Sequence, residues 1–108
     1  KFEYPINRYA METKRQLDVL DRRLAEVPFV AGADYSIADM ACYPWVVPYE
    51  RQQQDLARFA SLAAWFARIS ERPATERAYA LGLAINQAPN VNADSRSILF
   101  GQDANTVR

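Results

Sequence analysis

The side chains that could do chemistry are few, and they gather in one stretch, DYSIADMACYPW, at residues 34–45. This stretch contains Asp39, a carboxylate suited to general acid–base work, and Cys42, the single cysteine of the chain. The sequence has no histidine, so it cannot form a Cys–His or a Ser–His nucleophilic pair. A structural zinc site needs a full set of nitrogen or sulfur ligands, and only Cys42 is present. We therefore expect neither a nucleophilic pair of this kind nor a metal site in this chain.

The spacing of Ser36 and Asp39 is that of a capping box at the start of a helix. The Ser36 hydroxyl can accept a hydrogen bond from the backbone N–H of Asp39, whose carboxylate reaches back to the N–H of Ser36. Tyr35 and Met40 have the placement of the accompanying hydrophobic staple. We interpret Asp39 as structural rather than as a general acid or base. For Cys42, burial in the core is the expectation, and a reactive thiol is the alternative.

The composition is that of an ordinary soluble globular domain. Its 108 residues suffice for one hydrophobic core. Thirteen basic residues balance thirteen acidic ones, and no basic cluster is longer than Arg22-Arg23, so we expect no nucleic-acid partner. No apolar run is long enough to span a bilayer, so we expect no membrane association. A lone cysteine forms no internal disulfide, which fits the cytoplasm as the location.

Four helices are predicted to position these side chains. Apolar residues recur every three or four positions over residues 5–27, 36–50, 61–72 and 73–82. Pro28 ends the first of these helices, and Pro73 separates the third from the fourth. No segment shows the sustained alternation of a strand. The prediction is an all-α helical bundle over residues 1–85. An irregular polar tail follows over residues 86–108, with a short segment, SILF at 97–100, that could dock as a helical turn.

The second predicted helix is expected to point Ile37, Met40 and Trp45 into the core, because they recur at helical spacing. Pro44 and Pro48 lie inside the same predicted helix. Each proline removes a backbone donor, so we expect them to kink the helix and to open a groove beside it.

Three segments resemble one protein family: YPINRYAMETKRQLDVLDRRLAE at 4–26, SIADMACYPWV at 36–46 and ARFASLAAWFARISERPA at 57–74. They are similar to the all-helical C-terminal domain of glutathione transferases. Within that family they resemble the Nu-like group, also called glutathione-dependent disulfide-bond oxidoreductases, which is related to a yeast nitrogen regulator. The resemblance implies that residues 1–85 are part of this C-terminal domain. It also implies a thioredoxin-like N-terminal domain, absent from this chain, that holds the thiol-activating residue.

The resemblance places one glutathione contact in this chain. Arg8 stands beside Tyr9 in the RY pair of the first helix, where the arginine of the Nu-like group reaches a glutathione carboxylate. A guanidinium offers two parallel donors to a carboxylate, so the assignment is chemically reasonable. The alternative is an exposed helical arginine paired loosely with Glu12. Tyr4, one turn earlier, could line the same site.

Three further residues lie on or past the expected bend of the second helix, and the end of this helix lines the electrophile pocket in related transferases. The candidates for this substrate pocket are Tyr43, Tyr49 and Arg51. The structural alternative for the aromatic residues is packing in the core, as expected for aromatics at helical spacing.

Two functions follow from these patterns. The resemblance implies a parent protein that uses glutathione as co-substrate to reduce disulfides or to attack small electrophiles, and that works as a homodimer. It implies that this chain alone is inactive. The alternative is a non-catalytic helical interaction or dimerisation module, because transferase-like domains also occur in translation-factor and synthetase assemblies. The segment NRYAMETKRQLDVLDRRL favours the enzyme, since its resemblance to the Nu-like group extends beyond the shared capping segment.

Overall fold

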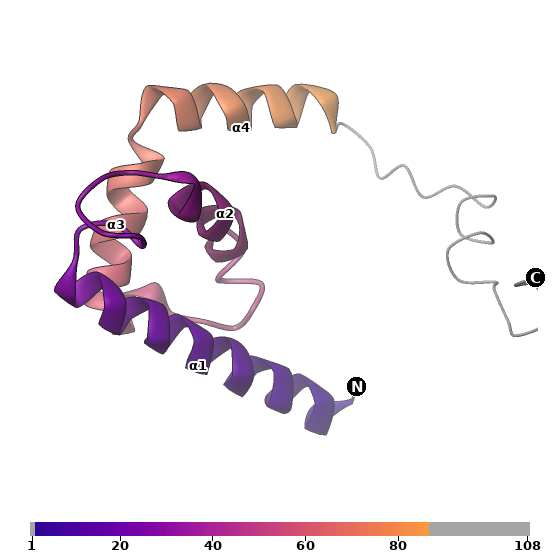
Figure 1. Cartoon of the computed structure of the whole chain (residues 1–108). Helices are drawn as coiled ribbons and strands as arrows, with labels where there is room; N and C mark the ends of the chain where they lie inside the picture. The colour runs from indigo at the N-terminus through magenta and orange to yellow at the C-terminus, as the bar shows by residue number, and fades with distance from the viewer. Residues whose placement is uncertain (1, 87–108) are drawn as a thin grey trace, which may run out of the picture. The chain divides into compact units, whose positions relative to one another are not determined.

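The computed structural model describes residues 2–86, and these form helices with no strand beyond an isolated bridge. The elements are α1 (Glu3–Glu26), α2 (Ile37–Val46), the 3₁₀ turn η1 (Leu56–Arg58), α3 (Ala60–Ser70) and α4 (Pro73–Ile85) (Figure 1). The all-α prediction is confirmed for this part of the chain. The predicted tail, including residues 97–100, lies outside the described residues. In the described range, no helix combines the length and the apolar character that crossing a membrane requires.

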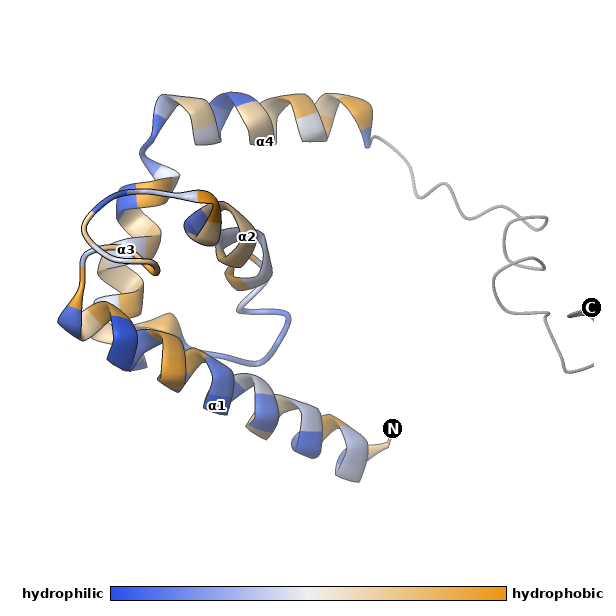
Figure 2. Cartoon of the chain, in the orientation of Figure 1, coloured by the Kyte–Doolittle hydropathy of each residue, from blue (hydrophilic) through white to orange (hydrophobic). Residues whose placement is uncertain are grey.

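Helix α1 alternates between hydrophilic and hydrophobic segments along its length (Figure 2). Leu17 and Leu24 are its buried residues, and α3 packs against it. Not all the apolar positions of α1 are buried, since Ile6 is 40% exposed and Tyr9 is 73% exposed. The N-terminal half of α1 extends past α2 and α3 (Figure 1). The loop before η1 reaches it at Ala10, whose carbonyl accepts from Gln54 Nε2 at 2.9 Å.

The loop after α1 is set by one proline and one glycine. Val27 is extended, with φ −136° and ψ 150°, as the residue before Pro28 should be. Phe29 and Gly32 then exchange two backbone hydrogen bonds of 3.0 Å, which close a tight turn. Gly32 has φ +151°, a conformation that side-chain-bearing residues rarely adopt. The turn brings Val30 to the first turn of α2.

Helix α2 ends at Val46, four residues before the predicted end at Glu50, so the prediction of one long kinked helix is wrong. Pro44 lies inside the helix, but Pro48 has no N–H to continue the ladder beyond it. The chain instead enters a series of turns in which Tyr49 N–H donates to the Val46 carbonyl at 2.9 Å. These turns carry the chain to η1.

The buried face of α2 differs from the predicted one. Asp39, Tyr43 and Val46 are buried, at the i, i+4 and i+7 positions of one helix face. Trp45 stands roughly 200° around the helix from Tyr43, since each residue turns by roughly 100°. Trp45 is 77% exposed, and Ile37 and Met40 are also exposed, so their expected inward orientation is wrong.

The core lies where α3 meets α1, α2 and η1. Its most deeply buried apolar side chains, Leu62, Trp65 and Ile69, recur at i, i+3 and i+7 along α3 and are at most 1% exposed. Burying a side chain of this size contributes on the order of 1.5–3 kcal/mol. The remaining apolar core residues are Leu17, Leu24, Tyr43, Val46, Leu56 and Phe59. This core fixes α2 and the C-terminal half of α1.

Helix α4 begins within a compact unit that spans Lys1–Glu76 and continues into a second unit, Arg77–Arg108. It contains no buried residue. The site described below lies wholly within the first unit.

Candidate functional site

A groove runs along the exposed N-terminal half of α1. It has a volume of about 820 Å³. The residues that line it are Tyr4, Asn7, Arg8, Tyr9, Met11, Glu12 and Arg15, and we call it the Arg8 groove. The structure therefore places two predicted site residues, Arg8 and Tyr4, in one groove. Two aromatic rings, those of Tyr4 and Tyr9, are 75% and 73% exposed there, so their hydroxyl groups are open to a ligand.

A carboxylate within this groove is firmly held. The guanidinium of Arg15 donates from Nε to Glu12 Oε2 at 2.9 Å and from Nη2 to Oε1 at 2.7 Å. The side-chain amide of Gln16 donates to the same Oε1 at 3.3 Å. These bonds lower the pKa of Glu12 to about 2, with the Arg15 bond as the largest cause and the Gln16 bond next. Glu12 is therefore ionised at all physiological pH values.

Arg8 makes no ion pair and no hydrogen bond through its side chain to any residue in the described range. The expected alternative was a loose pair with Glu12, and this pair is not formed, because Arg15 and Gln16 hold that carboxylate. Arg8 is still close enough for its charge to help lower the pKa of Glu12. The groove thus contains an exposed, unpaired guanidinium beside two phenol rings, an arrangement suited to binding a carboxylate.

The predicted substrate-pocket residues lie elsewhere. Tyr43 is 7% exposed and its ring stacks on Phe66 with centroids 5.0 Å apart. This burial argues against a place for Tyr43 in an open pocket. Tyr49 is half-buried, meets Phe66 edge-on at 6.0 Å and donates its hydroxyl to Glu50 Oε1 at 3.5 Å. Arg51 is exposed in the turn that follows. None of the three lines the Arg8 groove.

Ser36 and Asp39 form a capping box at the start of α2, with Asp39 Oδ2 accepting from Ser36 N–H at 2.9 Å. Asp39 also does more than the sequence pattern predicts. Its Oδ1 accepts from the backbone N–H of Val30 at 3.0 Å and from the indole Nε1–H of Trp65 at 2.8 Å. Asp39 therefore joins the loop, α2 and α3 at a fully buried position.

Burial alone would raise the pKa of the Asp39 carboxyl, but the bonds from Val30, Trp65 and Ser36 outweigh burial and lower it. A carboxylate with a lowered pKa and three donors already bound is a poor general base. This geometry agrees with a structural role for Asp39.

The two residues of the expected staple, Tyr35 and Met40, differ in burial. Met40 is 54% exposed, whereas Tyr35 packs edge-on against Phe29 at 6.0 Å. The guanidinium of Arg72 lies 3.8 Å above the Tyr35 ring, a cation–π contact. Tyr35 thus links the loop to the end of α3.

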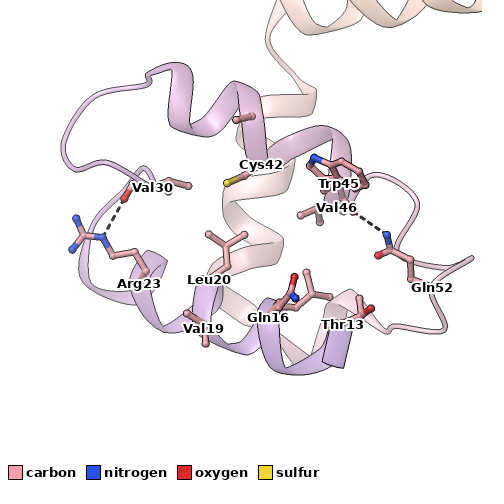
Figure 3. A pocket seen from close by; sticks show the side chains of 12 residues that line it. Thr13, Gln16, Val19, Leu20, Arg23, Val30, Cys42, Trp45, Val46 and Gln52 are labelled. Atoms are coloured by element: carbon pink, nitrogen blue, oxygen red, sulfur yellow. Dashed lines mark hydrogen bonds between the residues drawn. The ribbon is translucent and has the colours of Figure 1, made fainter. Parts of the chain in front are cut away.

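A second groove, which we call the α1–α2 groove, has a volume of about 650 Å³ (Figure 3). Val19 and Leu20 on one side and Cys42 and Trp45 on the other give it an apolar lining. Its rim is tied by two hydrogen bonds to backbone carbonyls, from Arg23 Nε to Val30 and from Gln52 Nε2 to Trp45, each 3.1 Å long.

Cys42 is half-buried in this groove rather than fully buried as expected. Burial, and then the negative charge of Asp39, raise the pKa of the Cys42 thiol. Its thiolate form is therefore disfavoured, which argues against a reactive thiol. No group of three or more His, Cys, Asp and Glu side chains within residues 2–86 could hold a metal ion.

Comparison with known proteins gives one family and several relatives. The family model described as glutathione S-transferase, C-terminal domain, matches residues 4–68. The disulfide-bond oxidoreductases YfcG and YghU of Escherichia coli are 48% and 44% identical to 69% and 71% of this chain. An uncharacterized GST-like protein of Streptococcus mutans is 47% identical over 72% of it. The matched region covers 35%, 29% and 33% of these relatives, so the chain spans about a third of their length.

Proposed function

This chain belongs to the glutathione S-transferase family as part of its C-terminal domain, and on that premise we propose that the whole protein is a glutathione-dependent disulfide-bond oxidoreductase or transferase. Two of its relatives are named as disulfide-bond oxidoreductases. Glutathione serves as the co-substrate, and a small disulfide or electrophile is the second substrate. No catalytic residue is assigned to this chain, since Asp39 is held by three N–H donors and the pKa of the Cys42 thiol is raised.

The observation that carries the proposal is the free guanidinium of Arg8. Arginine side chains on helix surfaces often pair with acidic neighbours, yet Arg8 has no such partner among residues 2–86. We assign to Arg8 the binding of a glutathione carboxylate, with Tyr4 and Tyr9 as flanking groups in the Arg8 groove. Arg8 cannot itself activate a thiol as a base, because a guanidinium keeps its proton in proteins. Its role is to hold and orient the ligand.

For the second substrate we retain Tyr49 and Arg51 as pocket residues, and Tyr43 supports them from the core through the Phe66 ring that it shares with Tyr49. We further propose that the whole protein is a cytoplasmic homodimer.

The test is a calorimetric titration of glutathione and glutathione disulfide into the whole protein, as wild type, Arg8→Ala and Lys14→Ala. Lys14 is the matched control, because it is an exposed cation on the same helix but does not line the Arg8 groove. Loss of the Arg8 contact should weaken binding by about 1–3 kcal/mol, the scale of a hydrogen bond to a charged group. Unchanged binding by Arg8→Ala would contradict the assignment of Arg8.

A helical interaction or dimerisation module is the second candidate function. The observation that favours it is the exposed apolar lining of the α1–α2 groove, where Trp45 is 77% exposed. Wild-type protein that binds neither form of glutathione would favour this alternative over the enzyme.

A further inference from the structure

The Arg8 groove contains two arginines but only one carboxylate. Arg8 and Arg15 both lie within reach of Glu12 along α1, at four residues before it and three residues after it. Glu12 pairs with Arg15, through two hydrogen bonds of 2.7 and 2.9 Å, and Arg8 stays unpaired. The two arginines are therefore competitors for one acid, and the outcome decides whether Arg8 is available.

Helix geometry gives a physical reason for this outcome. A helical pair is more stable when the acid precedes the base than when the base precedes the acid. Glu12 followed by Arg15 has the favourable order, whereas Arg8 followed by Glu12 has the unfavourable one. Gln16, which like Arg15 follows Glu12 in the sequence, donates a third hydrogen bond to Glu12 Oε1 at 3.3 Å.

We propose that Arg15 is a positioning residue, which holds Glu12 and thereby keeps the guanidinium of Arg8 free to bind the carboxylate of its ligand. This inference rests on the proposed function, in which that ligand is glutathione. Arg15 acts here through Glu12 and Arg8 rather than through a contact of its own with the ligand.

Removal of Arg15 should let Glu12 pair with Arg8. An exposed helical ion pair in this order is weak, so Arg8 would spend about half to two thirds of its time paired. Apparent affinity falls in proportion to the free fraction, which predicts glutathione binding about two- to threefold weaker in Arg15→Gln than in wild type. Removal of the competing acid in the double variant Glu12→Gln, Arg15→Gln should restore wild-type affinity.

The experiment measures the dissociation constant of glutathione for the whole protein as wild type, Arg8→Ala, Arg15→Gln, Glu12→Gln with Arg15→Gln, and Lys14→Gln. Lys14→Gln is the control for loss of one positive charge from the same part of α1, and it should leave affinity within about 1.3-fold of wild type, because an exposed charge is screened. Circular dichroism verifies that each variant keeps the helical content of wild type.

A second readout separates competition from a general charge effect. The pKa of the Glu12 carboxyl, followed by NMR, should barely change when Arg8→Ala is made in wild type. It should rise when Arg8→Ala is made in the Arg15→Gln protein, because Arg8 is then the partner of Glu12.

The outcomes are distinct. Three outcomes would overturn the positioning role and leave the proposed function intact. The first is weaker glutathione binding in Arg8→Ala but not in Arg15→Gln. The others are a Lys14→Gln variant that binds as weakly as Arg15→Gln, and a double variant that does not recover wild-type affinity. Loss of the proposed function itself would appear as wild-type protein without glutathione binding, or as Arg8→Ala without effect.

Discussion

Replacing Asp39 with alanine should come close to unfolding the first compact unit. The substitution removes the acceptor for three N–H groups, those of Val30 at 3.0 Å, Ser36 at 2.9 Å and Trp65 at 2.8 Å. A buried donor left without its acceptor costs about 1–3 kcal/mol. The Trp65 indole is fully buried and lies at the upper end of this range, whereas the Val30 and Ser36 donors are partly buried and lie lower. We expect a total loss of about 3–6 kcal/mol, against a typical stability of about 5–15 kcal/mol.

Urea unfolding followed by circular dichroism and tryptophan fluorescence measures this loss. Asp39→Asn is the milder variant, because its Oδ1 can still accept from Val30 and Trp65 while its amide group faces the Ser36 N–H. It should lose about 1–3 kcal/mol. Since the folded pKa of Asp39 is lowered, its charge contributes stability above the unfolded pKa of about 3.9 and loses that contribution as the pH falls through the folded pKa. The difference in free energy of unfolding between wild type and Asp39→Asn should therefore become smaller below about pH 4.

Asp34→Ala is the control, since Asp34 is an exposed acid in the same stretch, and its effect should stay within about 0.5 kcal/mol. The reasoning fails if Asp39→Ala costs less than about 1 kcal/mol, because the three donors would then have other partners.

Three smaller predictions concern single groups. NMR titration should give Glu12 a carboxyl pKa of about 2, and Arg15→Gln should raise it; an unchanged value would exclude Arg15 as the main cause. Gly32→Ala should lower the free energy of unfolding by about 1 kcal/mol or more through its φ of +151°, whereas Gly82→Ala should slow amide exchange in α4 by gaining about 0.5–1 kcal/mol of helix propensity. Stabilisation by both variants, or destabilisation by both, would contradict this prediction. Iodoacetamide should modify Cys42 faster in unfolding urea than in native buffer, because its pKa is raised in the fold, and equal rates would refute that.

The helices could be predicted from the sequence because their signals are local. Pro28, Ser36 and Pro73 mark ends that lie within two residues of the observed ones. The end of α2 was placed too late, since the apolar pattern continues past Val46 and two prolines within a helix can signal either a kink or a stop. The orientation of Trp45 was wrong because periodicity alone does not say which flank of an apolar helix meets a neighbour. The face of α2 that is buried is set by the contacts of Asp39 and Tyr43 with Trp65 of α3, which are long-range in sequence.

The candidate site was less accessible to prediction. Arg8 came from a resemblance, and its own spacing from Glu12 alone does not show whether the two residues pair. The Glu12–Arg15 pair does have a sequence signal, the i, i+3 spacing of opposite charges, which would have favoured a free Arg8. The bond from Trp65 to Asp39 joins residues 26 positions apart and has no local signal.

The central claim is that Arg8 binds a carboxylate of glutathione. The most direct test is a crystal structure of the whole protein with glutathione bound, in which the distance from the Arg8 guanidinium to the carboxylate oxygens is measured. We predict one or two hydrogen bonds of about 2.7–2.9 Å from Arg8, the length of a charge-assisted pair, with Glu12 still held by Arg15. An Arg8 side chain that pairs with Glu12, or that points to solvent while glutathione binds elsewhere, would contradict the claim.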